Sequence, residues 1–278
     1  MLRPNLIYPL GWKGHLHSRV NEIPKYNNVD VLVLGSSHAY RGFDPRIFEK
    51  YDLTMFNLGS SGQSPAAGHV LLQRYLDDLS PKIILYVLPP GSFYSKGIES
   101  SLDVIANDQN DSHTAKLALR VNHLKTYNTF IYGSMRNLFR LDKNFVEPIN
   151  RESEKYIAGG YVEKHDRNNI LDEQTEITWK LNEMQMEAFE ENLKLFKERN
   201  IPFIILQTPV TENIYQAYEN PEKYDELMNS YGEYHNFNGE IDLNDTLHFY
   251  DSHHMNSTGV EIFNRYFLDE MDLENRIR

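Results

Sequence analysis

Three almost continuous apolar runs alternate with helical stretches in the first 90 residues, and this rhythm restricts the chain to few folds. The runs cover residues 29–34, 53–58 and 82–88, and a glycine or a proline follows each of them. Apolar runs of this length, bounded by turn residues, are typical of strands buried in a parallel sheet. Helices are expected over 45–51 and 65–79, the first of which begins with proline behind an aspartate. The alternation therefore predicts consecutive βαβ units.

The rhythm stops after the third apolar run. Residues 93–178 contain no comparable run. Helices are expected there over 114–124 and 126–141, and a Gly-Gly pair at 159–160 interrupts the pattern. We interpret residues 93–178 as a mostly helical insertion, which forms either a cap over a functional site or a peripheral helical layer.

The alternation of strands and helices resumes at residue 179. Further helices are expected over 183–199, 212–229 and 258–272, and further strands over 202–206 and 246–250. Five strands in this order predict an α/β fold of the flavodoxin-like type, a three-layer α/β/α sandwich around a five-stranded parallel sheet. The chain would form one domain over residues 1–278 that contains the insertion.

The composition excludes several kinds of function. The 278 residues include no cysteine, so disulfide scaffolds, thiolate metal sites and a cysteine nucleophile are excluded. The formal net charge is −12, whereas nucleic-acid-binding domains are basic, so no nucleic-acid partner is expected. No run of 18 apolar residues occurs, and we therefore expect no membrane span in this chain.

The first eleven residues do not have the pattern of a signal peptide. They contain one arginine and a short apolar stretch that two prolines interrupt. A signal peptide needs a longer apolar region and a small-residue cleavage site. The sequence as it stands therefore predicts a cytoplasmic protein, and an export segment removed from its N-terminus would make it an exported or cell-surface protein.

Polar turns follow three of the predicted strands. They are Gly35-Ser36-Ser37-His38, the segment from Asn57 to Gly62, and Asp251-Ser252-His253-His254. Ligands of open parallel sheets bind outside the carboxyl ends of the strands, so these turns are the candidate site. Each turn has a simpler interpretation as an ordinary strand-to-helix connection.

The third turn combines a carboxylate with an imidazole. Asp251 stands three residues before His254 and can fold back onto its Nδ1–H group, which leaves Nε2 free to accept a proton from a hydroxyl. Because His248 and His253 lie nearby, a metal site built on the Asp251–His254 cluster is an alternative. The spacing is not the helical His spacing of zinc proteases.

Together the three turns resemble the SGNH (GDSL-type) hydrolases over residues 28–92 and 200–270. Gly35-Ser36-Ser37 is similar to the first block of that family, with Ser36 where aspartate is usual. The resemblance implies Ser37 as nucleophile, His254 as general base and Asp251 as the residue that orients His254. It also implies the backbone amides of Ser37 and Gly62 as oxyanion donors. His253 falls outside the pattern.

One departure from the family concerns the oxyanion hole. The third block of these hydrolases usually supplies an asparagine after the third strand, where this chain has Pro89-Pro90-Gly91-Ser92. Either the two amides suffice or Ser92 substitutes as the third donor. The opening and closing motifs are similar to a divergent branch that is associated with bacterial cell-surface polysaccharide and teichoic-acid modification.

Three further residues near these turns are weaker candidates for substrate binding. His38 and Arg41 follow the first turn, and Tyr94 follows the third strand. Arg41 could bind an acidic group of the substrate, although pairing with one of the 40 acidic residues is the simpler expectation. Tyr94 could line a sugar site or belong to the core.

The resemblance implies a serine-dependent acyl ester hydrolase or acyltransferase that needs no cofactor and no metal. The expected substrate is an O-acylated carbohydrate, in particular an O-acetylated one, or another small ester. Two alternatives stay open at this point. One is a catalytically inactive protein of this fold that serves as a glycan-binding or assembly module, and the other is the metal-dependent hydrolase on the Asp251–His254 cluster.

Overall fold

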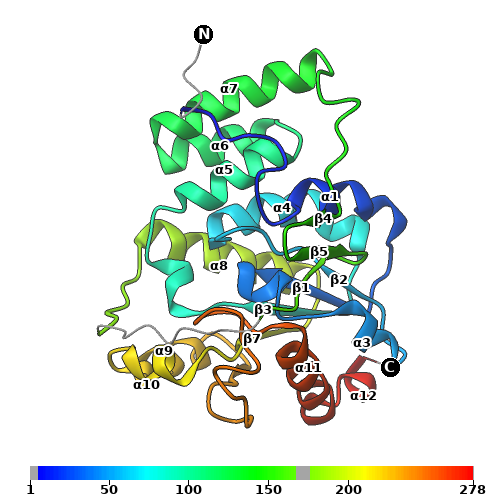
Figure 1. The fold of residues 1–278 in the computed structure, drawn as a ribbon. Helices are drawn as coiled ribbons and strands as arrows, with labels where there is room; N and C mark the ends of the chain where they lie inside the picture. Colours follow the sequence, from blue (N-terminus) through cyan, green and yellow to red (C-terminus); the bar gives the residue numbers. More distant parts are fainter. Residues whose placement is uncertain (1–5, 167–175, 278) are drawn as a thin grey trace.

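The computed structural model describes residues 6–166 and 176–277. Its centre is a five-stranded sheet in the order β2-β1-β3-β7-β8, in which every neighbouring pair is parallel. Helices surround this sheet (Figure 1). The strands of this sheet are β1 (Val31–Gly35), β2 (Met55–Asn57), β3 (Ile83–Val87), β7 (Phe203–Gln207) and β8 (Tyr234–Asn236).

The helices are of very different lengths. In chain order they are α1 (Leu16–Glu22), α2 (Ser37–Tyr40), α3 (Pro45–Glu49), α4 (Pro65–Leu79), α5 (Ile98–Asn107), α6 (Ser112–Val121), α7 (Leu124–Leu138), α8 (Glu183–Glu198), α9 (Glu212–Ala217), α10 (Pro221–Asn229), α11 (Ser257–Met271) and α12 (Leu273–Ile277). Short 3-10 helices occur at η2 (Ile23–Lys25) and η3 (Pro90–Phe93).

The core consists of two apolar layers, one on each face of the sheet. Alternate residues of β1 divide between them, since Leu32 and Leu34 join the layer with α4 and α8, whereas Val31 and Val33 join the layer with α3 and α11. All five residues of β1 and of β3 are buried. Burial on both faces explains why these strands are continuous apolar runs in the sequence. The expected α/β three-layer architecture is confirmed.

The fifth strand was placed wrongly from the sequence. It is β8, Tyr234–Asn236, rather than residues 246–250, of which Phe249 forms only an isolated antiparallel bridge with Met255. β8 has three residues and pairs only with β7 at the edge of the sheet. Such a short edge strand needs no long apolar run, which is the only signal that the sequence pattern could offer.

The helix predicted over 212–229 is two helices, α9 and α10. Proline at position 221 begins α10, and Asn220 before it has the left-handed φ of 49°. Proline disfavours the helical conformation of the residue that precedes it, so the chain cannot continue α9 through this point. The predicted single helix is therefore wrong at its centre.

Residues 93–166 contain a small second sheet as well as helices. The antiparallel strands β4 (Asn150–Arg151), β5 (Glu154–Ile157) and β6 (Tyr161–Lys164) pair in the order β4-β5-β6. Figure 1 shows α5, α6 and α7 gathered at one end of the molecule, with α7 outermost. The expectation of a mostly helical segment omitted this sheet. Residues 167–175 of the predicted insertion lie outside the described residues.

None of the described helices is both long enough and apolar enough to span a membrane.

Candidate active site

The first of the three predicted turns leaves β1 through a glycine that no other residue can replace. Gly35 has φ 145°, and a Cβ atom at this position would lie 2.4 Å from the carbonyl oxygen of Val87 in β3. The close approach lets the chain turn sharply at the carboxyl end of the sheet. Ser36 then occupies the N-cap position of α2, without a capping hydrogen bond from its side chain, and the first residue of α2 is Ser37.

The second turn is tied to the first by a buried asparagine. The side chain of Asn57, at the end of β2, donates from Nδ2 to the carbonyl of Ala39 at 2.8 Å. Its Oδ1 accepts from the amide of Gly59 at 3.0 Å. Asn57 thus fixes the turn that ends in Gly62 against the helix that begins with Ser37. Gly62 has φ 56°, a left-handed conformation that favours glycine.

The third turn places the carboxylate of Asp251 against the ring of His254. The Nδ1 atom of His254 lies 2.9 Å from Oδ1 and 3.0 Å from Oδ2 of Asp251. Oδ1 also accepts from the amides of His253 and His254, each at 2.9 Å. Burial alone would raise the pKa of Asp251, but the hydrogen bonds and the charge of His254 outweigh it and lower this pKa to about 2.

The ionised carboxylate determines how the imidazole of His254 is used. A carboxylate can only accept hydrogen bonds, so Nδ1 of His254 is the donor, and Nε2 of the neutral ring is an acceptor. Nε2 lies 2.7 Å from Oγ of Ser37. The hydroxyl of Ser37 therefore donates to Nε2, and the arrangement can pass the hydroxyl proton to the imidazole.

Two aromatic rings flank His254. Tyr250 stacks on it with ring centroids 5.4 Å apart and an interplanar angle of 6°, and His38 lies at 5.1 Å. Burial, together with the neighbouring rings of His254 and His253, holds the pKa of His38 well below its ordinary value. His38 is therefore neutral. Its Nδ1 atom lies 3.2 Å from Oγ of Ser36.

A cavity of about 580 Å³ opens over this arrangement. Five of the residues singled out from the sequence line it, namely Ser37, Arg41, Gly62, Asp251 and His254. Three others do not line it. His38 packs behind His254, Ser92 is buried in η3, and Tyr94 is 56% exposed on the surface.

Arg41 pairs with a carboxylate from the small antiparallel sheet. Its Nη2 atom donates to Oε1 of Glu154 in β5 at 2.6 Å, and its guanidinium lies 5.4 Å from the ring centroid of Tyr250. The simpler expectation for Arg41, an ion pair within the protein, is what the structure contains. The pair also attaches β5 to the first turn, so the small sheet forms one wall of the cavity.

Several lining residues were missed by the sequence analysis. The small sheet and the loop within it contribute Arg151, Glu152, Glu154 and Lys164, and the N-terminal segment contributes Trp12 and Lys13. Tyr250 could have been noticed as the aromatic neighbour of Asp251. The charged residues carried no comparable signal, because solvated surfaces contain the same residue types.

The lining of the cavity carries no formal net charge. Its basic residues are Lys13, Arg41, Arg151 and Lys164, and its acidic residues are Glu99, Glu152, Glu154 and Asp251. Across residues 6–166 and 176–277, no three His, Asp or Glu side chains are grouped so that they could hold a metal ion.

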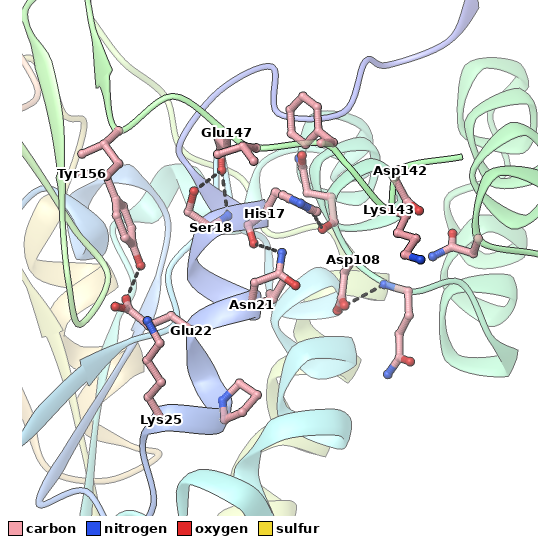
Figure 2. A pocket seen from close by; sticks show the side chains of 18 of the residues that line it. His17, Ser18, Asn21, Glu22, Lys25, Asp108, Asp142, Lys143, Glu147 and Tyr156 are labelled. Atoms are coloured by element: carbon pink, nitrogen blue, oxygen red, sulfur yellow. Dashed lines mark hydrogen bonds between the residues drawn. The ribbon is translucent and has the colours of Figure 1, made fainter. Parts of the chain in front are cut away.

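A second and larger cavity of about 860 Å³ lies between α1 and the ends of α5 and α7 (Figure 2). None of the residues predicted for the site lines it. Its carboxylates serve the protein itself, since Glu22 accepts from the hydroxyl of Tyr156 and Glu147 accepts from Ser18. We therefore place the candidate site in the smaller cavity, where the hydroxyl of Ser37 meets the imidazole of His254.

The chain was compared with known proteins. No protein-family model and no curated protein sequence matches it. Among solved structures it is similar to a Bacteroides fragilis protein provisionally described as an acylhydrolase, with 11% identity, a TM-score of 0.43, and coverage of 96% of this chain and 99% of that one. It is also similar to a Streptococcus pneumoniae protein provisionally described as a platelet activating factor, with 11% identity, a TM-score of 0.42, and coverage of 92% and 91%.

Proposed function

We propose that the protein is a serine-dependent acyl ester hydrolase or acyltransferase. The observation that carries the proposal is the 2.7 Å separation between Oγ of Ser37 and Nε2 of His254, whose Nδ1 is held by Asp251. A serine hydroxyl, an imidazole and a carboxylate in this sequence of contacts form the arrangement that activates serine nucleophiles.

In the proposed reaction, Oγ of Ser37 attacks the carbonyl carbon of an ester while its proton moves to Nε2 of His254. The tetrahedral intermediate then collapses, the ester bond breaks, and His254 returns the proton to the leaving alcohol. Water or a second alcohol attacks the acyl-serine in the same way and releases the acyl group. Asp251 stabilises the imidazolium that forms in each half of the reaction.

The developing negative charge needs donors, and two backbone amides are proposed for this role. In the described part of the chain, the amides of Ser37 and Gly62 donate to no protein acceptor, whereas the amide of Ser61, directly before Gly62 in the second turn, donates to Asp103. Gly62 and Ser37 both line the cavity. Ser92 does not line the cavity, so we propose the two backbone amides as the oxyanion donors and do not include Ser92 among them.

The lining of the cavity supports a small polar substrate. Charged residues of both signs balance, and Trp12, Tyr40 and Tyr250 supply aromatic surface among them. Amphipathic aromatic rings beside polar groups suit an uncharged carbohydrate, and the shortage of aliphatic lining disfavours a long acyl chain. We therefore propose an O-acylated carbohydrate, in particular an O-acetylated one, as the substrate.

The metal-dependent alternative has less support. Both oxygens of Asp251 lie within hydrogen-bond distance of Nδ1 of His254, and Oδ1 accepts from two amides as well. A metal ion bound to this carboxylate would compete with those contacts. The serine mechanism uses the contacts as they are.

Labelling with a fluorophosphonate probe tests the proposal together with hydrolysis of p-nitrophenyl acetate. The wild-type protein should be labelled and should release p-nitrophenol, and Ser37→Ala should abolish labelling and lower the rate by about 10⁴-fold or more. Ser36→Ala, which removes the neighbouring hydroxyl, is the matched control and should keep the label. A folded wild-type protein that is neither labelled nor active on acylated glycans would show that the site is not catalytic.

A further inference from the structure

The outermost helix of the molecule, α7, exposes an apolar face over its last two turns, and Leu124 is exposed on the same side at its start. Leu124, Ile131, Met135 and Leu138 recur at intervals of seven, four and three residues, which places them on one side of the helix. All four are exposed, Leu138 to 76% of its surface. The opposite side of α7, with Thr126, Thr129, Gly133 and Arg136, is buried against the protein.

The apolar surface continues beyond the end of α7. Phe139 and Leu141 are exposed directly after the helix, and Val146 in the following loop is 83% exposed. We call the exposed apolar residues from Leu124 to Val146 the α7 surface. Single exposed apolar side chains are ordinary, but several on one side of a helix and in the loop directly after it indicate an interaction site.

The α7 surface is set in the most basic part of an acidic protein. Residues 112–146 contain six basic residues and one acidic residue, a net charge of +5, whereas the whole chain carries −12. One of the six, Arg120 in α6, is already paired with Glu187 and Glu191 of α8. The single acidic residue, Asp142, is already paired with Arg136 at 3.1 Å. Arg140 and Lys143 are exposed after the helix, and in the described residues neither forms an ion pair.

We propose that the α7 surface docks the protein onto an anionic lipid surface. Exposed leucine, isoleucine, methionine and phenylalanine side chains would enter the boundary between head groups and acyl chains. Arg140 and Lys143, which follow the helix, would lie at the level of the anionic head groups, although Lys143 also lines the larger cavity. Lys125 at the other end of the helix is half-buried, with its ammonium 5.8 Å from the ring centroid of Tyr8. A basic amphipathic helix with this division of residues is typical of a segment that lies in the plane of a membrane interface.

A second copy of the chain is the less suitable occupant. A symmetric contact would bring the same cations of the two copies towards each other, and no acidic residue on this surface is free to neutralise them. An anionic surface would neutralise Arg140 and Lys143 together. Docking in this way leaves the cavity with Ser37 untouched, so the inference does not depend on the proposed function.

Co-sedimentation of the full-length chain with lipid vesicles tests the inference. Vesicles of phosphatidylcholine mixed with an equal amount of phosphatidylglycerol should bind the protein, vesicles of phosphatidylcholine alone should bind it far less, and added salt should release it. Ile131→Glu combined with Leu138→Glu should abolish binding. Arg140→Gln and Lys143→Gln should each weaken binding about fivefold, since one cation near such a surface contributes about 1 kcal/mol.

Two substitutions elsewhere serve as matched controls. Leu247→Glu changes an exposed apolar residue between β8 and α11, and Lys197→Glu reverses an exposed cation of α8. Both variants should bind the mixed vesicles as the wild type does. If the paired glutamate variant does not fold, the two glutamine variants decide, because they change only exposed cations.

Three results would overturn the inference. The first is absence of wild-type binding to the mixed vesicles, and the second is equal binding to both kinds of vesicle. The third is a dimer, seen by sedimentation velocity without lipid, that Leu138→Glu dissociates, because it would assign the surface to a second copy.

Discussion

The Nε2 atom of His254 lies 2.7 Å from the Oγ atom of Ser37, although 217 positions separate the two residues in the chain. A buried asparagine of α11, the helix that follows His254, holds the two regions together. Asn264 donates from Nδ2 to the carbonyl of Gly42 at 2.6 Å and accepts at Oδ1 from the amide of Asp44 at 2.8 Å. Gly42 and Asp44 follow directly on the helix that begins with Ser37, so Asn264 determines where His254 lies relative to Ser37.

Asn264→Leu should therefore disturb both the stability and the proposed reaction. The leucine is similar in size but leaves a buried carbonyl and a buried amide without partners, which costs about 1–3 kcal/mol for each group. We expect urea unfolding to show a loss of roughly 2–4 kcal/mol in the free energy of unfolding. Labelling of Ser37 by a fluorophosphonate should slow in the fraction that is still folded.

The matched control is Asn275→Leu in α12, where the side chain of the exposed asparagine bonds, among the described residues, only to Asp272. It should change the unfolding free energy little, as exposed substitutions usually do. Equal effects of the two substitutions would contradict the anchoring role of Asn264.

Asp251→Asn tests the orientation of the imidazole rather than the presence of a side chain. An asparagine can keep its oxygen on the amides of His253 and His254, but its NH₂ group would then face Nδ1. Nδ1 would have to become the acceptor, so the hydrogen of the neutral ring would sit on Nε2. Nε2 could then no longer accept the proton of Ser37. We expect kcat for p-nitrophenyl acetate to fall by about 10⁴-fold, while circular dichroism and the melting temperature change little.

Asp251→Glu makes this prediction more specific. Glutamate keeps the charge and a hydrogen-bond acceptor but moves the carboxylate by one methylene group, so part of the activity should survive. Asparagine and glutamate variants with equal residual activity would show that the tautomer is not what Asp251 controls.

Arg19 joins three segments that are far apart in the sequence. Its fully buried guanidinium donates to the carbonyls of Gly14 at 3.0 Å, Gly59 at 2.8 Å and Gly160 at 2.7 Å. Arg19→Met keeps most of the apolar stem but leaves these buried acceptors without donors. We expect a loss of at least about 3 kcal/mol in the free energy of unfolding, measured by urea titration with tryptophan fluorescence.

Arg19→Lys separates geometry from charge at this position. An ammonium group carries the same charge but lacks the planar fork that reaches several carbonyls at once. The lysine variant should therefore be destabilised nearly as much as the methionine variant. Full stability of the lysine variant would indicate that charge alone is needed.

The sequence predicted the interior of the sheet and its edge strand β2, but it failed at the opposite edge. β1, β3 and β7 are buried on both faces, and this burial requires the continuous apolar runs that were recognised. β8, with the sequence Tyr-His-Asn, has one neighbouring strand and only its first residue is buried. A local pattern cannot identify such a strand, because its pairing with β7 and not its own composition makes it a strand.

The candidate site, like the sheet, was only partly predictable from the sequence. Two of the three turns follow the strands β1 and β2, whereas the third follows residues 246–250, which form no strand of the sheet. The turns nevertheless indicated Ser37, Asp251 and His254, and the structure places these three side chains in contact, while their catalytic roles stay a prediction. The opposite wall of the cavity comes from β5 and β6, whose polar residues resemble any solvated surface. The ion pair between Arg41 and Glu154 spans 113 positions, a distance over which sequence spacing carries no information.

Asp103 gives the protein a pH-dependent stability that can be measured without knowing its activity. The carboxyl is completely buried, and burial outweighs the hydrogen bond from the amide of Ser61 and the charge of Arg19, so the pKa of Asp103 rises to about 7 from 3.8. Between these two values the folded protein holds a proton that the unfolded chain has lost. Its free energy of unfolding must therefore fall as the pH rises through this range, by about 1.4 kcal/mol per pH unit.

Asp103→Asn removes this titration and isolates its effect. Between pH 5 and pH 8 the wild type should lose about 3 kcal/mol more stability than the variant, because only the wild type must ionise a buried carboxyl over this interval. Urea unfolding at the two pH values measures the difference. Any constant cost of the asparagine, whose NH₂ group would face the donors Ser61 and Asn107, cancels when each protein is compared with itself. Parallel pH profiles of the two proteins would show that the pKa of Asp103 is not raised in the fold, and a wild type that gains stability relative to the variant would show that it is lowered.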